Sequence, residues 1–116
     1  MSAPVCITPF DVVEAQFTAY NAQDLDAHCA AFADDVVVAD FNGAVTISGI
    51  DAYRQKYRQV FADFPQNRAE LLNRMVVGHH VIDHERVYRA PGADPFEVAA
   101  IYTVSDARIV RVDFIK

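Results

Sequence analysis

Basic residues and cysteines are both scarce in this sequence. Ten lysines and arginines stand against sixteen aspartates and glutamates, which gives a formal net charge of −6. Nucleic acids and anionic membranes attract basic proteins, so this charge argues against both as partners. Two cysteines, Cys6 and Cys29, are too few for a disulfide scaffold. We expect two buried thiols in a cytoplasmic protein, with a disulfide between them as the alternative.

Long apolar runs and glycine-rich segments are also missing. No apolar run approaches the roughly 20 residues that cross a bilayer, and the N-terminal segment lacks the charged and apolar regions of a signal peptide. With four glycines in the chain, no glycine-rich phosphate loop, nucleophile elbow or Cys-His pairing is visible. His79 and His80 are expected in a turn, and together with Asp83 and His84 they match no zinc spacing. The sequence therefore predicts no metal site and no cofactor.

What the sequence does contain is enough apolar residues for one packed domain, residues 1–116, since 53% of the chain is hydrophobic. Caps, helical spacing and a proline stop predict three helices: one from the Thr8 cap to about Ala22, one from the Asp24 cap to Asp34-Asp35, and one from the Ser48 cap to Pro65. Their predicted buried faces are Phe10, Val13, Phe17 and Tyr20 for the first, Leu25, Cys29 and Phe32 for the second, and Ile50, Tyr53, Tyr57, Val60, Phe61 and Phe64 for the third.

Alternating and apolar segments predict strands at 36–41, 44–47, 68–78, 81–89, 96–104 and 108–115. Asn42-Gly43 is typical of a two-residue turn between the first two strands. In the last strand, Val110, Val112 and Phe114 share one face, while Ile109, Arg111, Asp113 and Ile115 share the other. Helices that precede a run of hairpin-connected strands are typical of an α+β domain.

Asp40 is the most conspicuous chemical group, because it ends an otherwise apolar strand. Alternation places it on the face of Val36 and Val38. If that face lines an apolar cavity, Asp40 is suited to abstract a proton or activate water. The alternative is a structural aspartate that bonds the backbone of the turn at Asn42-Gly43.

The element order α-α-β-β-α-β-β-β-β, with FADDVVVADFNG followed by ISGIDAYRQKYRQVF, resembles the nuclear-transport-factor-2-like superfamily, in its SnoaL-like (polyketide-cyclase-like) and ketosteroid-isomerase-like branches. The resemblance implies a cystatin-like α+β roll, in which a cone-shaped, curved, mixed or antiparallel sheet and three helices in the N-terminal half enclose a pocket. We also expect a homodimer through the convex sheet face, because the mixed set Ile109, Arg111, Asp113 and Ile115 suits a moderately polar, two-fold interface. The pocket residues that the resemblance implies are Gln16, Tyr20, Phe32, Tyr53, Tyr57, Val98, Ala100, Tyr102, Val112 and Phe114.

The chain resembles the ketosteroid isomerases at some of their catalytic positions but not at others. Asp40 falls on the general base and Tyr57 on a supporting tyrosine of the third helix. Gln16 replaces the oxyanion-donating tyrosine, and Ala100 falls at or near the protonated aspartate. The two main donors to an enolate are therefore absent, and we do not expect ketosteroid isomerisation itself.

Asp83, His84 and Glu85 interrupt the apolar strand 81–89 with three ionisable residues. The resemblance places Asp83 and Glu85 inward, where a carboxylate facing Asp40 would leave one group as acid and the other as base. In one alternative the gap in the resemblance is misplaced and His84 faces inward as a proton shuttle. In another, all these charges lie on the outer face, with His84 and Arg86 at a dimer contact.

Three functions fit these patterns. The first is a cofactor-free acid–base enzyme of the isomerase, dehydratase or cyclase type, acting on a small, largely apolar molecule. The second is a non-catalytic module that binds such a molecule or dimerises. The third is a protein-transport adaptor, which only the name of the superfamily favours.

Overall fold

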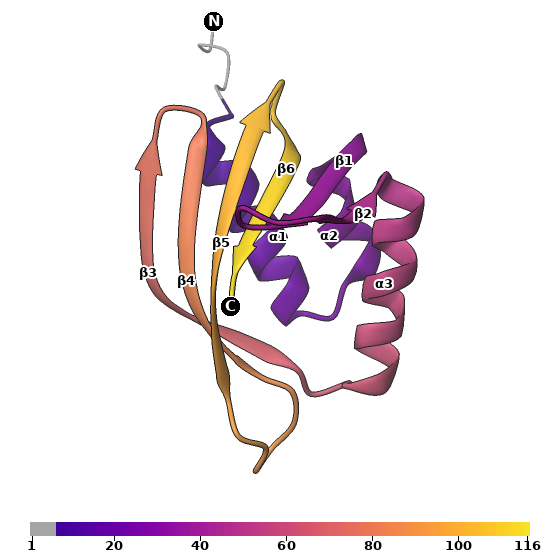
Figure 1. Ribbon diagram of the computed structural model, residues 1–116. Helices are drawn as coiled ribbons and strands as arrows, with labels where there is room; N and C mark the ends of the chain where they lie inside the picture. The colour runs from indigo at the N-terminus through magenta and orange to yellow at the C-terminus, as the bar shows by residue number, and fades with distance from the viewer. Residues whose placement is uncertain (1–6) are drawn as a thin grey trace, which may run out of the picture.

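The computed structural model describes residues 7–116, which form three helices and a six-stranded sheet (Figure 1). In chain order these are α1 (Pro9–Asn21), α2 (Leu25–Ala30), β1 (Phe32–Asp40), β2 (Val45–Ser48), α3 (Ile50–Asp63), β3 (Arg68–Val77), β4 (His80–Tyr88), β5 (Phe96–Ser105) and β6 (Arg108–Ile115). The predicted element order and α+β class are confirmed. Cys29 is buried and free, whereas Cys6 lies outside the described residues.

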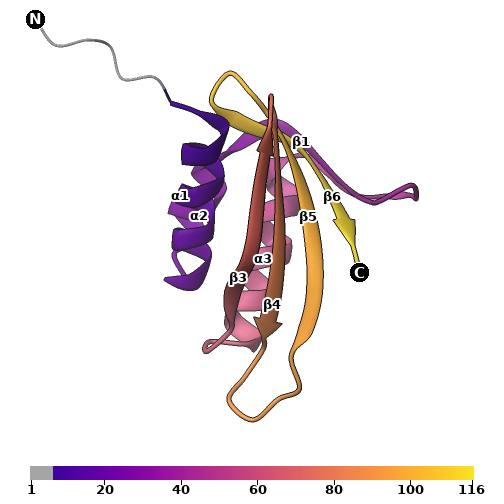
Figure 2. The same cartoon turned by 90° about the vertical axis from the view of Figure 1, so that its left-hand side faces the viewer.

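The sheet is mixed, with the strand order β2-β1-β6-β5-β4-β3. Every neighbouring pair is antiparallel except β1 and β6, which run parallel. The three helices lie on one face of the bent sheet, as the two views in Figures 1 and 2 agree. Across residues 7–116, none of the helices has the length and apolar character needed to span a bilayer.

Helix α1 begins as its sequence predicts. Thr8 and Asp11 form a reciprocal capping box, in which the Asp11 N–H donates to the Thr8 hydroxyl (3.2 Å) and the Thr8 N–H donates to the Asp11 carboxylate (3.0 Å). The buried residues of α1 are Val12, Val13, Gln16 and Ala19. Phe10 is exposed, so its predicted burial is wrong. The side of α1 that faces the sheet is centred away from Phe10, whose ring lies 5.0 Å from the Arg74 guanidinium.

Helix α2 ends earlier than predicted, at Ala30 rather than at Asp34-Asp35. The backbone N–H of Ile109 donates to the Ala31 carbonyl (2.8 Å), and Phe32 pairs with Ile109 of β6. The last strand thus draws these residues into the sheet. Asp34 and Asp35 are exposed in an irregular part of β1, between its two paired segments.

The β1–β2 turn and the start of α3 also differ from the prediction. The loop between β1 and β2 has four residues, 41–44, instead of two. The Gly43 N–H donates to the Asp40 carbonyl (2.8 Å), the Asp40 N–H donates to the Ala44 carbonyl (3.0 Å), and Asn42 adopts φ 55°. The N-cap of α3 is Gly49 and not Ser48. Gly49 has φ 88°, a conformation that favours glycine, and its N–H donates to the Val36 carbonyl (2.7 Å).

The inward face of β6 is shifted by one residue near its start. Ile109 is fully buried and Val110 is half-buried, although Val110 shares the predicted face of the pocket residues Val112 and Phe114, and Ile109 shares the opposite face. A register shift in the β5–β6 pairing, between Thr103 and Val104, breaks the alternation there. Beyond it, Val112 is buried and Phe114 lines the cavity, as predicted.

Candidate functional site

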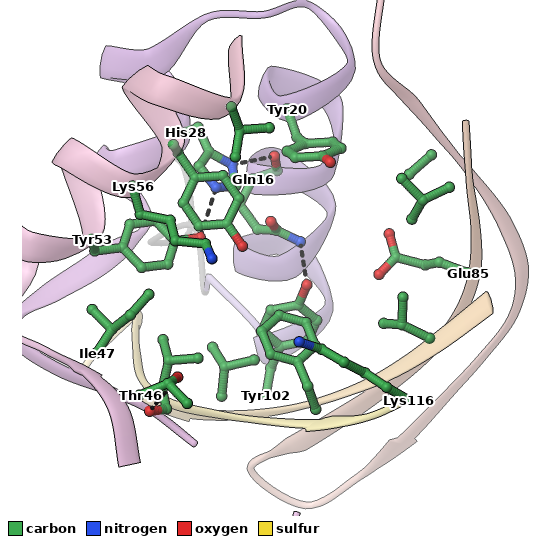
Figure 3. A pocket seen from close by; sticks show the side chains of 18 of the residues that line it. Gln16, Tyr20, His28, Thr46, Ile47, Tyr53, Lys56, Glu85, Tyr102 and Lys116 are labelled. Carbon is green, nitrogen blue, oxygen red and sulfur yellow. Dashed lines mark hydrogen bonds between the residues drawn. The ribbon is translucent and has the colours of Figure 1, made fainter. Parts of the chain in front are cut away.

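A cavity of about 270 Å³ lies between the helices and the sheet (Figure 3). Its volume is just below the roughly 300–1,000 Å³ of typical small-molecule pockets. Helices α1, α2 and α3 line one side, and strands of the sheet line the other. The predicted pocket residues that do line it are Gln16, Tyr20, Tyr53, Tyr57, Val98, Tyr102, Val112 and Phe114. A role for them in binding a substrate stays a prediction.

Two predicted pocket residues are buried without lining this cavity. The Phe32 ring packs behind it, 4.3 Å from the Tyr53 ring centroid and 5.2 Å from the His28 ring centroid. Ala100 is fully buried within β5 and does not line the cavity. The prediction that these two residues line the pocket is therefore wrong, and both belong to the packed core around it.

Glu85 is the carboxylate that the sheet directs into the cavity. Alternation along β4 buries Val81, Asp83, Glu85 and Val87 on the inward face, as one of the predicted orientations requires. The Glu85 side chain points toward the middle of the cavity in Figure 3, and the residue is 8% exposed. Within residues 7–116, no hydrogen bond from a side chain or backbone N–H reaches its carboxyl group.

The surroundings of Glu85 change its acidity. Burial raises the pKa of Glu85 to about 7, the negative charge of Asp83 adds to this rise, and Arg74 opposes it. A carboxyl group with this pKa exists in both protonation states near neutral pH. It can therefore both accept and donate a proton.

Asp83 lies two residues from Glu85, but its carboxylate is held by an ion pair inside the core. It is 0% exposed, and Arg74 on β3 donates to both of its carboxylate oxygens (Nε–Oδ1 2.7 Å, Nη2–Oδ2 2.9 Å). Arg74 also bonds Glu14 of α1, so the three charges tie β3, β4 and α1 together. Asp83 does not line the cavity, and its predicted role opposite Asp40 has no geometric basis.

His84 faces away from the cavity. It is exposed, and its Nε2 lies 2.7 Å from Glu97 Oε1 on the outer face of the sheet. The alternative in which His84 faces inward as a proton shuttle is therefore wrong. His84 instead fits the outer-face pattern of charges, beside Arg86, which lies 3.7 Å from Glu70.

Asp40 lies at the rim of the cavity rather than inside it. It lines the cavity but is exposed, because it is the last residue of β1 and the turn carries it beyond the cover of the helices. Its expected burial in an apolar hollow is wrong. The structural alternative is not observed either, because within the described residues the Asp40 side chain has no hydrogen bond to the turn. A catalytic role for Asp40 stays a prediction.

His28 is a polar residue of the cavity that the sequence reasoning missed. It is 2% exposed, and its ring nitrogens bond the Gln16 carbonyl (Nδ1–O, 2.9 Å) and the Tyr53 hydroxyl (Nε2–Oη, 2.8 Å). A carbonyl oxygen can only accept, so Nδ1 carries the proton and the neutral ring accepts the Tyr53 hydroxyl at Nε2. Burial lowers the pKa of His28 to about 4, so the ring is neutral at physiological pH.

Helical periodicity alone could have predicted that His28 faces the interior. The residue lies three residues after Leu25 and four before Phe32, so helical spacing places it on the inward face with them. His79 lies in the β3–β4 turn and His80 begins β4, and both are exposed. Among the residues that the structure describes, no group of three or more histidine, cysteine or acidic side chains is placed to hold a metal ion.

The hydroxyl groups of Tyr102 and Tyr20 line the cavity and accept hydrogen bonds from neighbouring side chains. Gln16 Nε2 donates to Tyr102 Oη (3.2 Å), while Asn67 Nδ2 (2.6 Å) and Arg89 Nη1 (3.3 Å) donate to Tyr20 Oη. Each hydroxyl oxygen thus accepts from the protein, which leaves its own proton free for a ligand. Burial raises the pKa of both tyrosines, so both stay protonated at neutral pH.

Comparison with known proteins places this geometry in a family. A profile of the SnoaL-like domain matches residues 13–112. No curated protein matches the chain.

Solved structures share the whole fold. A cystatin-fold protein from Novosphingobium aromaticivorans is 32% identical, with a TM-score of 0.88 over 96% of this chain and 100% of that one. A protein from Sinorhizobium meliloti, described as a polyketide cyclase, is 30% identical, with a TM-score of 0.76 over 90% and 94%. An epoxide hydrolase from M. tuberculosis shares the fold at 21% identity, with a TM-score of 0.77 over 91% and 80%. The profile match and the first of these structures each cover nearly the whole chain, which therefore belongs to the SnoaL-like domain family.

Proposed function

We propose that the protein is an enzyme that transfers protons on a small, largely apolar carbonyl compound, using side chains alone. The observation that carries this proposal is the position and acidity of the Glu85 carboxyl group. This group is buried, points into the cavity without a bonding partner in the described chain, and has a pKa of about 7. Perturbed carboxyl groups in apolar cavities are typical of acid–base catalysis.

In the proposed reaction, the Glu85 carboxylate removes a proton from the carbon next to the substrate carbonyl. The electron pair of that C–H bond moves onto the carbonyl oxygen, and the Tyr102 hydroxyl donates a hydrogen bond to the resulting enolate. Glu85 then returns the proton to a different carbon, which gives an isomer. A substrate with a leaving hydroxyl group would instead lose water, with Glu85 donating the proton to it.

The other polar groups fit supporting roles in this scheme. Gln16 orients the Tyr102 hydroxyl through the 3.2 Å hydrogen bond. His28 donates to the backbone carbonyl of Gln16 and accepts from the Tyr53 hydroxyl. It is a poor base, because its unprotonated nitrogen Nε2 already accepts a hydrogen bond. Asp40, the base expected from the family resemblance, lies at the rim, and we assign proton transfer to Glu85 in its place. Asp40 remains the second carboxylate to test.

The test compares the wild-type protein with Glu85→Gln and Asp40→Asn. Small ketones and enones that raise the melting temperature are first selected as binders. Exchange of their α-carbon protons in D₂O is then followed by NMR. We expect Glu85→Gln to slow the exchange by roughly 10²- to 10⁴-fold, the usual contribution of a general base, and Asp40→Asn to keep most of the rate.

The pH dependence gives a second readout of the same experiment. A base must be ionised, so the exchange rate should rise through pH 7 as Glu85 loses its proton and level off above pH 8. The other ionisable groups that line the cavity are Tyr20, His28, Asp40, Tyr53, Lys56, Tyr57, Arg89, Tyr102 and Lys116, and the charges of Asp83 and Arg74 also act on Glu85. Exchange that is absent for every bound ketone, or that is unchanged in Glu85→Gln, would refute the proposal.

A second candidate function is non-catalytic binding of the same class of molecule. It is favoured by the aromatic wall of the cavity, where the Tyr53 and Tyr57 rings pack with centroids 4.5 Å apart and planes tilted by 30°. It is also favoured by the internal hydrogen bonds of His28 and Gln16, which leave few polar groups for chemistry. Tight binding of a ketone without any proton exchange would select this function.

A further inference from the structure

Both lysines of this acidic chain line the same cavity. The sequence has only two lysines, Lys56 and Lys116, against sixteen acidic residues. Lys56 comes from α3 and Lys116 follows β6, yet both line the cavity. Figure 3 shows the two side chains reaching toward the cavity from different walls. Both lysines are exposed residues that line the cavity, so their ammonium groups lie where it opens to solvent.

Neither ammonium group is neutralised by a neighbouring carboxylate. Some surface cations of this chain do have such a partner, as Arg54 has in Asp26 and Arg111 in Asp113. Within residues 7–116, no ion pair involves Lys56 or Lys116. The Lys116 ammonium group lies 5.8 Å from the ring centroid of Phe114, over an apolar part of the wall.

The third cation of the cavity has other partners. Arg89 donates to Asn67 Oδ1 (2.9 Å), and its guanidinium lies between the rings of Phe64 (5.5 Å) and Phe96 (5.2 Å). The two lysines and Asp40 together leave one net positive charge at the rim, since two ammonium groups outweigh one carboxylate. A single negative charge on a ligand would balance it.

We propose that the ligand of this cavity is an amphipathic carboxylic acid, whose carboxylate lies between Lys56 and Lys116 while its apolar part enters the cavity. The position of the reacting carbonyl near Glu85 rests on the proposed function, whereas the carboxylate site does not. The substrate class is therefore a small oxo acid with an apolar body. An amine would meet two like charges at the entrance, although Glu85 could attract it from within.

Calorimetric titration with three probes of one skeleton tests this inference on the full chain. The probes are 4-phenylbutanoate, 4-phenylbutanol and 4-phenylbutylamine, which differ in charge and share the apolar part. At low salt we expect the acid to bind about tenfold more tightly than the alcohol and the amine to bind most weakly. Added salt should reduce the advantage of the acid, because exposed charges are screened.

Neutral variants then assign the effect to the two lysines. Lys56→Gln and Lys116→Gln should each weaken binding of the acid about two- to fivefold, as exposed ion pairs do, and leave the alcohol unaffected. The double variant should bind acid and alcohol equally. Arg58→Gln is the matched control, because Arg58 is an exposed cation of α3 that does not line the cavity.

Several outcomes would overturn the carboxylate site. They are an alcohol or amine that binds as tightly as the acid, a double variant that still prefers the acid, and an acid that does not bind at millimolar concentration. Proton exchange separates this failure from that of the proposed function. Exchange that depends on Glu85 without any preference for acids would sink only the carboxylate site. A preference for acids that survives without exchange would sink only the catalytic role.

Discussion

Glu85 and Asp83 have the same chemistry and face the same side of β4, but their partners differ. Asp83 receives two hydrogen bonds from Arg74, which compensate its charge within the core. Glu85 lies two residues further along β4 and borders the cavity, and within the described chain no cation forms an ion pair with it. One carboxylate thus stabilises the fold, while the other is available for chemistry.

The raised pKa of Glu85 predicts a pH-dependent cost to stability. Because its pKa rises from 4.5 to about 7 on folding, the favourable contribution is complete below pH 4.5 and is lost as the pH rises through 7. The shift corresponds to roughly 3 kcal/mol of unfolding free energy. Glu85→Gln, which carries no charge, should therefore be more stable than wild type at pH 8 and similar to it at pH 5.

Urea denaturation of both proteins at the two pH values measures this difference. Asp40→Asn serves as the control, because Asp40 is an exposed carboxylate of the same cavity. A stability difference between Glu85→Gln and wild type that does not change from pH 5 to pH 8 would contradict the assigned pKa.

At the scale of elements, the ion triad of Glu14, Arg74 and Asp83 fastens α1 to the β3–β4 hairpin. Arg74→Ala leaves Asp83 charged and unpaired in the core, so we expect a loss of about 3–5 kcal/mol of unfolding free energy. Glu14→Ala removes the half-exposed partner and should cost at most about 1 kcal/mol. Denaturation with circular dichroism measures both losses.

A compensating variant keeps this prediction testable if Arg74→Ala does not fold. Arg74→Met combined with Asp83→Leu replaces the buried pair by apolar side chains and should recover most of the stability. Equal and small losses in Arg74→Ala and Glu14→Ala would show that Asp83 does not depend on Arg74.

The elements that sequence alone predicts well are those set by nearby residues. Thr8 caps α1 through Asp11, three residues away, and Pro65 follows the end of α3. The errors arise where pairing with a strand distant in the sequence determines the end of a helix or the buried face of a strand. Ile109 of β6 draws Ala31 and Phe32 into the sheet, and the register shift beside Val104 turns Ile109 inward. Neither partner is visible in a local pattern.

The same distinction applies to the site. Alternation places Glu85 and His84 on opposite faces of β4, but only the packed helices decide which face encloses the cavity. Asp40 follows the face of Val38, yet its exposure depends on where the cover of the helices ends. His28 is within reach of helical periodicity, whereas its bonds to Gln16 and Tyr53 require three helices to be packed together.

For the whole molecule, we expect a homodimer through the sheet face that points away from the helices. Ile101 and Ile115 are partly exposed there, beside the polar residues His84, Glu97 and Arg111. This mixture is typical of moderately polar, two-fold interfaces. Ile101→Asp should give monomers with an unchanged cavity, because Ile101 faces away from its buried neighbours. Sedimentation velocity measures both proteins, and a wild-type monomer at micromolar concentration would refute the dimer.

The parallel pairing of β1 with β6 joins two strands that are about 70 residues apart in the sequence, in the interior of the sheet. During translation, β1 therefore leaves the ribosome long before the strand beside it exists. Until then its apolar edge is without its native neighbour and open to chaperones or to other nascent chains. The sheet can close only once β6 has been synthesised, so the cavity between sheet and helices is completed late, long after its helices have emerged.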